Sequence, residues 1–582
     1  MSACHGCSGD LVGIGPAHGT AGTDAMAGIA SGTLAGKTPR EHDPRATVFS
    51  NGTILAMDDR LTQPAAIAIA AGKIVAAGSL DDALASAGPD PQRVDLDGRT
   101  LMPGLIDPHQ HPVPGGLMLT QTLSVSYDRY KSKAEVLDVL IAKAAATPAG
   151  QWIYASYYDN LLHGGYLTMA ELDAVSTQHP IFVYYVSMHT ATGNRLAFDA
   201  AGVEPSVREL PGGGYFGVDA AGAHNGMIFE MPALLKFLRG FPKLTPELVG
   251  AAIMKFLYQS AALGVTMVHE AGSLAQKAAA YEGYRTVTAH SPVRLSVSPI
   301  VDYFDGALEF LKPYGTPTVR AVQIPGALLS FYAVKIVLDG SPQQQTAYQS
   351  LPYLGSESRG NPNYTAERLN ELVAQVAAAG WTISIHCNGD ASLDMALDAI
   401  EAAYGSQPPS GINRIEHCAM TRPEQIGRMK RLGVQPSHLM NNVYYYGSAY
   451  RDAIFGPERA ARFNAAGDFY RNGVPFTIHS DCPCSPVAPL REIGTAVTRR
   501  CSIDGSVVGA DQAVPIEAAL RAMTSAAARQ CGLGDKLGSL EAGKYADLAI
   551  FERDPRSADP DKLGDIRASE TWVDGHRVLL PG

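Results

Sequence analysis

The chain has 582 residues, of which 46% are hydrophobic and 18% are charged, a composition typical of a folded globular protein. Lysine and arginine number 46 against 57 aspartates and glutamates, so the formal net charge is −11. Because no dense basic patch interrupts this acidic balance, nucleic-acid binding is not expected. No apolar run reaches the ~18–20 residues that a membrane-spanning helix needs, so we expect no integral membrane segment.

The cysteines and the first residues of the chain bear on its location. Eight cysteines are too few for a disulfide scaffold, and the N-terminus lacks the basic and apolar stretches of a signal peptide. A reducing cytoplasm is therefore the expected compartment. Residues 1–44 are rich in Gly, Ala and Ser without periodicity, and they are predicted to form a flexible arm or lid.

Short strands separated by Gly and Asp mark both ends of the remaining chain. Near its start, strands are predicted at 47–49, 67–69 and 73–75. Near its end, strands are predicted at 546–551 and in a hairpin at 571–579. We therefore expect residues 45–102 and 541–582 to form one small β-sandwich domain built from both chain ends.

The middle of the chain, 103–540, alternates strands with amphipathic helices. In one example, Thr365 caps a helix that Gly380 closes, and the buried run 381–386 follows at once. Repeated strand–helix–strand units with continuously apolar strands indicate a parallel sheet covered on both faces. Nine such strands are predicted, at 105–106, 181–186, 265–268, 295–300, 334–338, 381–386, 414–417, 434–437 and 475–481.

This pattern predicts an α/β fold, a (β/α)8 TIM barrel over 103–540 with large insertions. A plain barrel has eight strands and about 250 residues, so one of the nine strands belongs elsewhere and insertions must lengthen the rest. We expect the insertions mainly around 112–180 and 190–260.

Residue types that bind metals close several of these strands. His109 and His111 lie two residues apart, so in extended chain both rings face the same side and can grip one metal ion. His386, His417 and Asp481 each end a separate strand. A single strand-terminal histidine is more often a hydrogen-bonded core residue. Several at the carboxyl ends of parallel strands, where barrel active sites lie, indicate a metal site.

Lys335 is a charged residue inside an otherwise apolar strand, Tyr332-Ala-Val-Lys-Ile-Val-Leu-Asp-Gly340. On its own, an ion-paired lysine, or one whose amine reaches solvent, is the simpler explanation. Its place among the strands that carry the histidines adds it to the candidate site.

The order of these residues resembles the metal-dependent amidohydrolase superfamily. The motif Met102-Pro-Gly-Leu-Ile-Asp-Pro-His-Gln-His111 is followed by Lys335, His386, His417 and Asp481. The segment 538–551 then resembles the stretch by which the chain of superfamily members returns to the β domain. Finer similarity points to the family 3 branch, which includes N-substituted formamide deformylases; it lies at 187–194, 264–270, 335–340 and 386–390. The resemblance covers about 46–582.

The resemblance implies a distorted (β/α)8 barrel with a small β-sandwich and a metal centre at the barrel mouth. It implies that His109 and His111 hold the more buried metal, with Asp481 nearby. It further implies that His386 and His417 hold a second metal.

In the same scheme Lys335 bridges both metals as a carbamate. A neutral amine can add carbon dioxide and become an anionic oxygen ligand, and burial favours the neutral amine. An unmodified Lys335 would instead leave a mononuclear site and would polarise the substrate. Zinc, two ions per chain, is the expected cofactor because histidines with a carboxylate suit it; Mn, Fe and Ni stay open.

The resemblance also implies a reaction that uses metal-activated hydroxide. The metal lowers the pKa of its bound water to about 7 and polarises the substrate carbonyl. Asp481 acts as general base and acid, taking the proton and passing it to the leaving amine. His189 and Asn194 are expected to contact the substrate oxygen or line the pocket, with an inter-loop hydrogen bond as the alternative. The same two alternatives hold for His269 and Glu270, with core hydrogen bonding favoured.

The expected function is hydrolysis of a linear carbon–nitrogen bond, in an amide, N-formyl or N-acyl compound that carries an apolar or aromatic group. The alternatives are a deaminase or cyclic amidohydrolase on the same scaffold and, outside enzymes, a barrel that binds a ligand without chemistry. The expected partner is an amide-type small molecule, with neither nucleic acid nor membrane, and a homodimer stays open.

Overall fold

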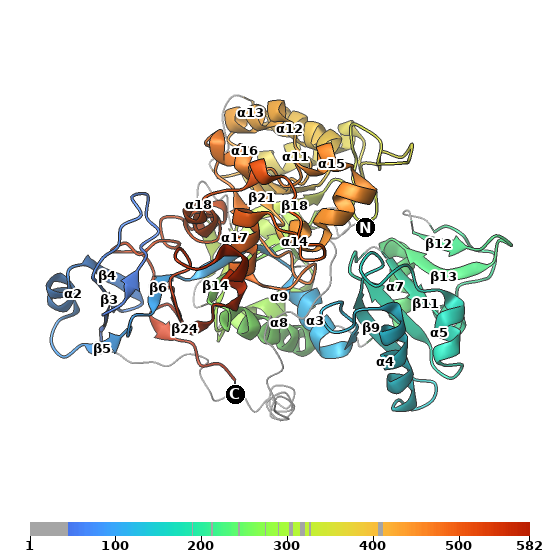
Figure 1. Ribbon diagram of the computed structural model, residues 1–582, viewed down its shortest axis with the longest axis horizontal. Coiled ribbons are helices and arrows are strands. Elements are labelled where there is room, and N and C mark those ends of the chain that lie inside the picture. Colours follow the sequence, from blue (N-terminus) through green and yellow to red (C-terminus); the bar gives the residue numbers. More distant parts are fainter. Residues whose placement is uncertain are drawn as a thin grey trace. The chain divides into compact units, whose positions relative to one another are not determined.

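The computed structural model describes residues 45–188, 190–210, 214–241, 245–273, 275–288, 290–301, 306–314, 321–324, 327–405 and 411–581. The predicted arm at 1–44 lies outside them. The described chain divides into an insertion unit, residues 112–245 with 481–486, and a main unit that holds the other residues. Figure 1 labels the elements of both. Within the described residues, no helix combines the length and the apolar character that crossing a membrane requires.

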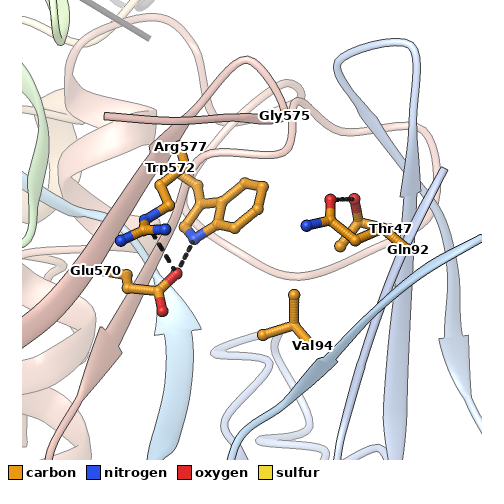
Figure 2. A pocket seen from close by; sticks show the side chains of 7 residues that line it. All are labelled: Thr47, Gln92, Val94, Glu570, Trp572, Gly575 and Arg577. Atoms are coloured by element: carbon orange, nitrogen blue, oxygen red, sulfur yellow. Dashed lines mark hydrogen bonds and ion pairs between the residues drawn. The ribbon is translucent and has the colours of Figure 1, made fainter. Parts of the chain in front are cut away.

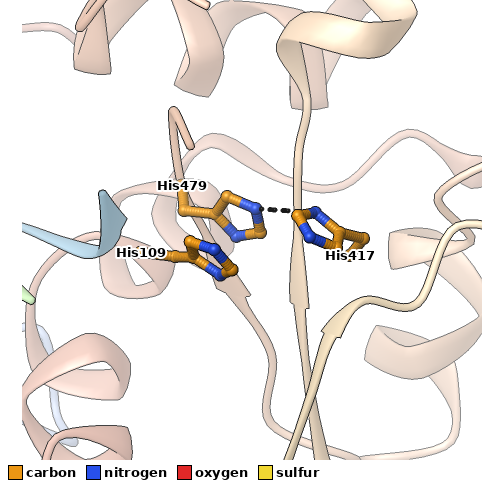
Figure 3. A group of neighbouring side chains, drawn as sticks. All are labelled: His109, His417 and His479. Atoms are coloured by element: carbon orange, nitrogen blue, oxygen red, sulfur yellow. Dashed lines mark hydrogen bonds between the residues drawn. The ribbon is translucent and has the colours of Figure 1, made fainter. Parts of the chain in front are cut away.

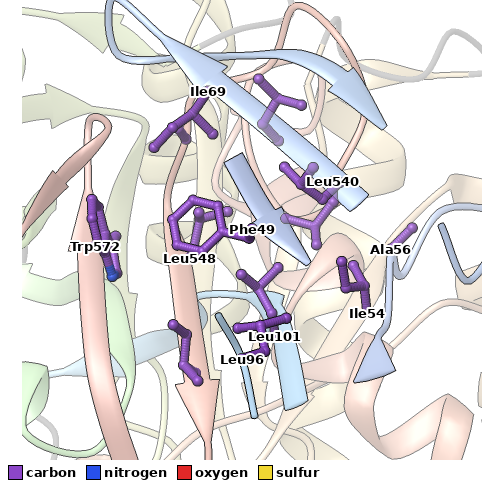
Figure 4. Close-up of a cluster of buried hydrophobic side chains, with 13 residues drawn as sticks. Phe49, Ile54, Ala56, Ile69, Leu96, Leu101, Leu540, Leu548 and Trp572 are labelled. Carbon is purple, nitrogen blue, oxygen red and sulfur yellow. The ribbon is translucent and has the colours of Figure 1, made fainter. Parts of the chain in front are cut away.

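Strands from both chain ends form two sheets of the main unit that share one hydrophobic core. The first sheet, in the order β4-β3-β1-β5, contains β1 (Thr47–Ser50), β3 (Ala66–Ala70), β4 (Lys73–Gly78) and β5 (Gln92–Asp95). The second, in the order β2-β6-β23-β24-β25, contains β2 (Thr53–Ile54), β6 (Thr100–Pro103), β23 (Leu548–Phe551), β24 (Ala568–Val573) and β25 (His576–Arg577). Phe49 and Trp572 meet edge to face within this core, with ring centroids 5.2 Å apart (Figure 4).

Parallel strands make up the centre of the main unit. They lie in two sheets of order β16-β17-β15-β14-β7 and β18-β19-β20-β21-β22. Their bounds are β7 (Leu105–Gln110), β14 (Val265–Ser273), β15 (Arg294–Pro299), β16 (Val322–Gln323), β17 (Leu329–Phe331), β18 (Ala333–Val337), β19 (Thr382–Cys387), β20 (Arg414–His417), β21 (Gln435–His438) and β22 (Thr477–Ile478). Among these ladders only β16 with β17 is antiparallel. The arrangement is a TIM-barrel-like α/β fold.

One stretch of chain joins the two parallel sheets. Strand β17 pairs with β15 in the first sheet, and after Tyr332 the chain continues as β18 at the edge of the second. Ile300 and Lys335 form a further parallel bridge between the sheets. With β17 and β18 taken as one strand, eight parallel strands of the described chain follow one another in space in their order along the sequence.

Helices connect these strands and bury their apolar faces. Thr365 accepts a hydrogen bond from the Arg368 N–H and begins α11 (Ala366–Ala378), as its sequence predicts. The other main-unit helices are α2 (Leu80–Ala87), α8 (Pro246–Ala261), α9 (Ala278–Thr288), α10 (Ala307–Leu311), α12 (Asp390–Tyr404), α13 (Pro423–Leu432), α14 (Asn441–Ala449), α15 (Pro457–Ala460), α16 (Ala466–Arg471), α17 (Pro489–Thr498), α18 (Ile516–Ala522) and α19 (Ser525–Gln530).

The insertion unit carries a six-stranded sheet in the order β12-β13-β11-β10-β9-β8. Its strands are β8 (Leu123–Ser124), β9 (Ile153–Tyr158), β10 (Ile181–Tyr185), β11 (Thr190–Gly193), β12 (Tyr215–Val218) and β13 (His224–Phe229). Its helices are α3 (Pro112–Gln121), α4 (Lys133–Ala145), α5 (Met169–Val175), α6 (Arg195–Ala201) and α7 (Met231–Phe237). The prediction of a barrel strand at 181–186 is wrong, because these residues form β10. A continuously apolar strand has the same sequence pattern in any sheet that is covered on both faces, so the pattern does not tell which sheet contains it.

A buried ion pair ties the parallel strands to the sheets formed by the chain ends. Arg294, the first residue of β15, donates from Nε to Asp547 Oδ2 over 2.8 Å, and the Arg294 and Asp547 side chains are only 8% and 3% exposed. Asp547 precedes β23 directly. Arg294 also donates to Asp574 Oδ1 over 3.0 Å.

Arg294→Met is expected to lower the free energy of unfolding by about 3–5 kcal/mol, because it leaves the buried Asp547 carboxylate without its cation. The matched control is Arg285→Met in α9, whose pair with Glu282 is exposed and is expected to contribute less than about 1 kcal/mol. Chemical unfolding followed by circular dichroism measures both. Equal losses in the two variants would contradict a stabilising role of the buried pair.

Candidate metal centre

Three imidazole rings meet where the parallel strands end. His109 lies in β7, His417 ends β20, and His479 follows β22 directly (Figure 3). One ring nitrogen of each lies within 4.8 Å of those of the other two. The His109 and His479 rings stack with centroids 4.5 Å apart, and all three side chains are buried. Nitrogen atoms grouped this closely fit the coordination of a metal ion.

Two further histidines extend this group. The ring centroids of His111 and His109 lie 5.3 Å apart, and those of His386 and His417 lie 4.6 Å apart. Both added rings are buried. The structure thus brings together the four histidines that the sequence singles out, and it adds His479.

Lys335 is fully buried in β18 beside these histidines. No group among the described residues forms a hydrogen bond with its Nζ. A Cβ added at Gly272 would lie 3.5 Å from Lys335 Cγ and 3.6 Å from His111 Cε1, so both side chains pack against this glycine. A buried amine without a partner is unfavourable unless it is neutral, is modified or meets a ligand.

Burial sets the protonation state of the cluster. Desolvation by burial lowers the pKa values of His109, His417 and His479 well below the usual 6.5. A neutral imidazole binds metals, whereas a protonated ring has no free lone pair. His109, His417 and His479 are therefore in their metal-binding protonation state at neutral pH.

Glu416 holds the ring of His109 in one tautomer. His109 Nδ1 donates to Glu416 Oε2 over 2.6 Å, which leaves the lone pair on Nε2. Arg414 donates to the same oxygen over 2.9 Å, and the Ser384 hydroxyl donates to Oε1 over 2.6 Å. All these side chains are buried. A carboxylate behind a ligating histidine fixes its orientation and raises its basicity.

The backbone bends where β20 ends, and both Glu416 and His417 reach the cluster. His417 and Cys418 have φ angles of 67° and 47°, in the left-handed region that residues with side chains rarely adopt. In a regular strand, neighbouring side chains point to opposite faces. Sequence reasoning selected His417 and missed Glu416, although a carboxylate inside a short buried strand was an available signal.

Asp481 and His189 complete the set of predicted site residues. Asp481 is buried and follows Ser480, whose backbone N–H donates to the Asp107 carboxylate over 3.2 Å. Asp481 also adopts a left-handed φ of 54°. His189 lies outside the described residues.

Three further candidates, Asn194, His269 and Glu270, form hydrogen bonds within the protein, which is the alternative to substrate contact. Asn194 caps α6, because its Oδ1 accepts a hydrogen bond from the Ala197 N–H over 2.9 Å. His269 lies between the hydroxyls of Ser296 and Ser298, at 2.9 and 3.0 Å. In the same core, Glu270 accepts a hydrogen bond from the Tyr284 hydroxyl over 2.6 Å.

A separate cavity of about 120 Å³ opens between strands of the terminal sheets (Figure 2). Its lining consists of Thr47, Gln92, Val94, Glu570, Trp572, Gly575 and Arg577. Glu570 accepts the indole N–H of Trp572 over 3.0 Å and pairs with Arg577 at 3.7 Å. The charged groups of this cavity are therefore paired with one another, and it contains none of the clustered histidines.

The fold and the buried cluster define a class of protein, the metal-dependent hydrolases built on a TIM-barrel-like scaffold. Comparison with known proteins then gives the family. Residues 92–579 match the sequence profile of the amidohydrolase family, and the chain belongs to that family.

Individual relatives agree with this assignment. The chain is 26% identical over 548 residues to an N-substituted formamide deformylase of Arthrobacter pascens, covering 91% of this chain and 98% of that protein. It is 26% identical over 540 residues to the protein LONG AFTER FAR-RED 3 of Arabidopsis thaliana, covering 89% of each. An uncharacterized metal-dependent hydrolase of Pyrococcus horikoshii OT3 has a similar structure, with a TM-score of 0.69, 25% identity and coverage of 88% and 99%. The protein is a hydrolase of carbon–nitrogen bonds other than peptide bonds.

Glu416→Gln is expected to weaken zinc binding about 10–100-fold, because His109 loses the anionic partner that holds its ring. The matched control is Glu371→Gln in α11, whose carboxylate is exposed and pairs with Arg368. Competition with a chromogenic chelator measures both affinities, and circular dichroism checks folding. An unchanged zinc affinity in a folded Glu416→Gln protein would contradict this role.

Proposed function

We propose that the protein hydrolyses a linear carbon–nitrogen bond of an amide, N-formyl or N-acyl compound to a free amine and an acid. The observation that carries the proposal is the buried cluster of uncharged imidazoles at the carboxyl ends of the parallel strands. Similarity over most of both chains to a protein named as an N-substituted formamide deformylase supports this bond type.

The donor set fits a metal ion, and zinc is the metal we propose. His109 and His111 would hold one ion together with Asp481, and His386 and His417 would hold a second. A bound zinc ion supplies a Lewis acid that polarises a carbonyl and lowers the pKa of water to about 7. Histidine nitrogens with a carboxylate form a set that zinc favours.

Lys335 is proposed to complete this set as a carbamate. Its neutral Nζ would form a bond to the carbon of carbon dioxide and release one proton, which leaves a carboxylate on the side chain. The fully buried Nζ, without a hydrogen-bond partner among the described residues, supports this proposal. The new oxygens would give the site an anion that the four histidines lack.

Asp481 is proposed to move the proton of the reaction. Its carboxylate would accept a proton from the attacking water and would then donate it to the nitrogen of the leaving amine. General acid–base catalysis of this kind contributes about 10²–10⁴-fold to the rate. Asp481 is buried and lies three residues after the end of β22, which supports a place near the ends of the parallel strands.

The domain arrangement is part of the proposal. We propose that residues 103–540 form a distorted, closed (β/α)8 barrel and that 45–102 with 541–582 form a β-sandwich. Eight parallel strands in sequence order support the barrel, and the shared core of the two terminal sheets supports the sandwich.

The test is a screen of zinc-loaded protein against N-formyl amines, N-acyl amines, cyclic amides and aminopurines. We expect a free amine and an acid from the linear amides. Removal of the metal by a chelator should abolish turnover, and added zinc should restore it. Ammonia released from an aminopurine, or opening of a cyclic amide without cleavage of the linear ones, would instead support the deaminase or the cyclic amidohydrolase.

Lys335→Ala is expected to reduce turnover at least 100-fold, because the site loses its bridging anion, and short carboxylic acids such as acetate or propionate should restore part of it. Initial rates against acetate concentration measure the rescue, and Lys143→Ala on α4 is the control for the loss of a lysine. In wild-type protein equilibrated with ¹³C-bicarbonate, a carbamate resonance is expected. Its absence, together with no rescue, would contradict the carbamate.

A further inference from the structure

Asp339 is a buried carboxylate that the proposed reaction does not use. It lies two residues after the end of β18, the strand that carries Lys335, and its side chain is fully buried. The neighbouring strand β19 carries His386, a proposed ligand of the second zinc ion. The two strands pair up to this point, because Val337 lies opposite His386 and the Leu338 N–H donates to the His386 carbonyl oxygen over 3.1 Å.

Three backbone N–H groups and one hydroxyl converge on the Asp339 carboxylate. Its Oδ1 accepts a hydrogen bond from the Asn388 N–H over 2.9 Å, and its Oδ2 accepts one from the Gly389 N–H over 2.8 Å. Oδ2 also accepts a hydrogen bond from the Tyr348 N–H over 3.1 Å and contacts the Ser392 hydroxyl. A backbone N–H can only donate, so both carboxylate oxygens are needed as acceptors.

These bonds hold the turn that follows His386. Asn388 and Gly389 are the second and third residues after the histidine, and Gly389 precedes α12 directly. The Asn388 Nδ2 donates to the Gly340 carbonyl oxygen over 2.9 Å. Both this amide nitrogen and this carbonyl oxygen lie 3.1 Å from His386 Nε2. The ring of His386 thus lies against two segments that Asp339 ties together, its own neighbour Gly340 and the turn.

The turn also packs tightly against the loop 340–348. A Cβ added at Gly389 would lie 1.8 Å from the Tyr348 carbonyl oxygen, and one added at Gly340 would lie 2.1 Å from Thr346 Oγ1. Only a glycine permits so close an approach. Steric contact therefore prevents the loop from moving toward the turn, and the hydrogen bonds of Asp339 hold it from moving away.

A second carboxylate at the same turn has different partners. Asp390 is buried and begins α12. It accepts hydrogen bonds from the Ser350 N–H over 2.8 Å and from Arg422 Nη1 over 2.7 Å. These partners belong to a later part of the loop and to the residue before α13. Asp390 therefore offers a control of similar burial and similar hydrogen bonding.

We propose that Asp339 is a positioning residue of the metal centre, which holds the His386 ring in place for the second zinc ion by fixing the turn 387–389. This inference rests on the proposed function in that it requires a second ion beside His386 and His417. It assigns to the centre a carboxylate that acts through the backbone around a ligand. Loss of such an outer group typically weakens metal binding about 10–100-fold.

The decisive variant is Asp339→Asn in the full chain. The amide keeps the size of the side chain and one acceptor oxygen, but its NH₂ group would face at least one backbone N–H, and two donors cannot share a hydrogen bond. Either the Asn388 N–H or those of Gly389 and Tyr348 would lose their acceptor, and the turn would shift. The matched control is Asp390→Asn, which weakens the bonds to Ser350 and Arg422 at the same turn.

Two measurements follow the two ions separately. Zinc titration against a chromogenic chelator gives the affinity of each ion, and anomalous diffraction shows which histidines hold it. The expected result is at least a 10-fold weaker second ion in Asp339→Asn, whose anomalous peak is lost beside His386 and His417 and kept beside His109 and His111. Both affinities should be nearly unchanged in Asp390→Asn. Chemical unfolding measures how much stability each variant loses.

A folded Asp339→Asn protein with both affinities at their wild-type values would overturn the inference and leave the proposed function in place. Equal weakening of both ions, or the same selective loss in Asp390→Asn, would also overturn it, because a general loss of stability would then explain the effect. Wild-type protein that binds one ion or none would contradict the second ion of the proposed function, and the inference with it.

Ser392→Ala covers the case in which Asp339→Asn fails to fold, because it removes only one partner of the Asp339 carboxylate. The inference predicts a smaller loss of zinc affinity that is again confined to the second ion. Equal affinities for this ion in wild type and a folded Ser392→Ala protein would then overturn it.

Discussion

The site depends on keeping several imidazole rings uncharged inside the protein. Taking a ring out of water disfavours its protonated form, and each positive neighbour disfavours it further. The rings therefore keep their lone pairs, and close packing of these lone pairs becomes favourable only when a cation lies between them. The buried carboxylate of Glu416 balances the positive groups around the cluster. Arg414 and Ser384 satisfy this carboxylate in turn.

The parallel strands supply the alignment that this packing needs. His109 and His479 are 370 residues apart in the chain, yet their rings stack because β7 and β22 end in the same region. The left-handed backbone at His417 brings two neighbouring side chains to the cluster where a regular strand would bring one. This local strain is compensated by the buried hydrogen bonds around Glu416.

The sequence predicted those features that repeat with a fixed spacing. The His-x-His motif, the capped helix at Thr365 and the apolar strands follow from local chemistry, and their positions in the structure agree. Strand 181–186 was misplaced because its apolar pattern is the same in either sheet. Glu416 and His479 were missed because their places in the cluster come from contacts between distant strands, of Glu416 with His109 and of His479 with His109 and His417, which local spacing does not contain.

The central claim is that the imidazole cluster binds metal, and anomalous X-ray diffraction from zinc-loaded crystals tests it most directly. Data collected on both sides of the zinc absorption edge locate the ion without reference to activity. The account predicts anomalous peaks at the clustered histidines, one beside His109 and His111 and one beside His386 and His417, with nitrogen atoms at about 2.0–2.1 Å. Zinc-saturated crystals with no anomalous peak at these rings would contradict it.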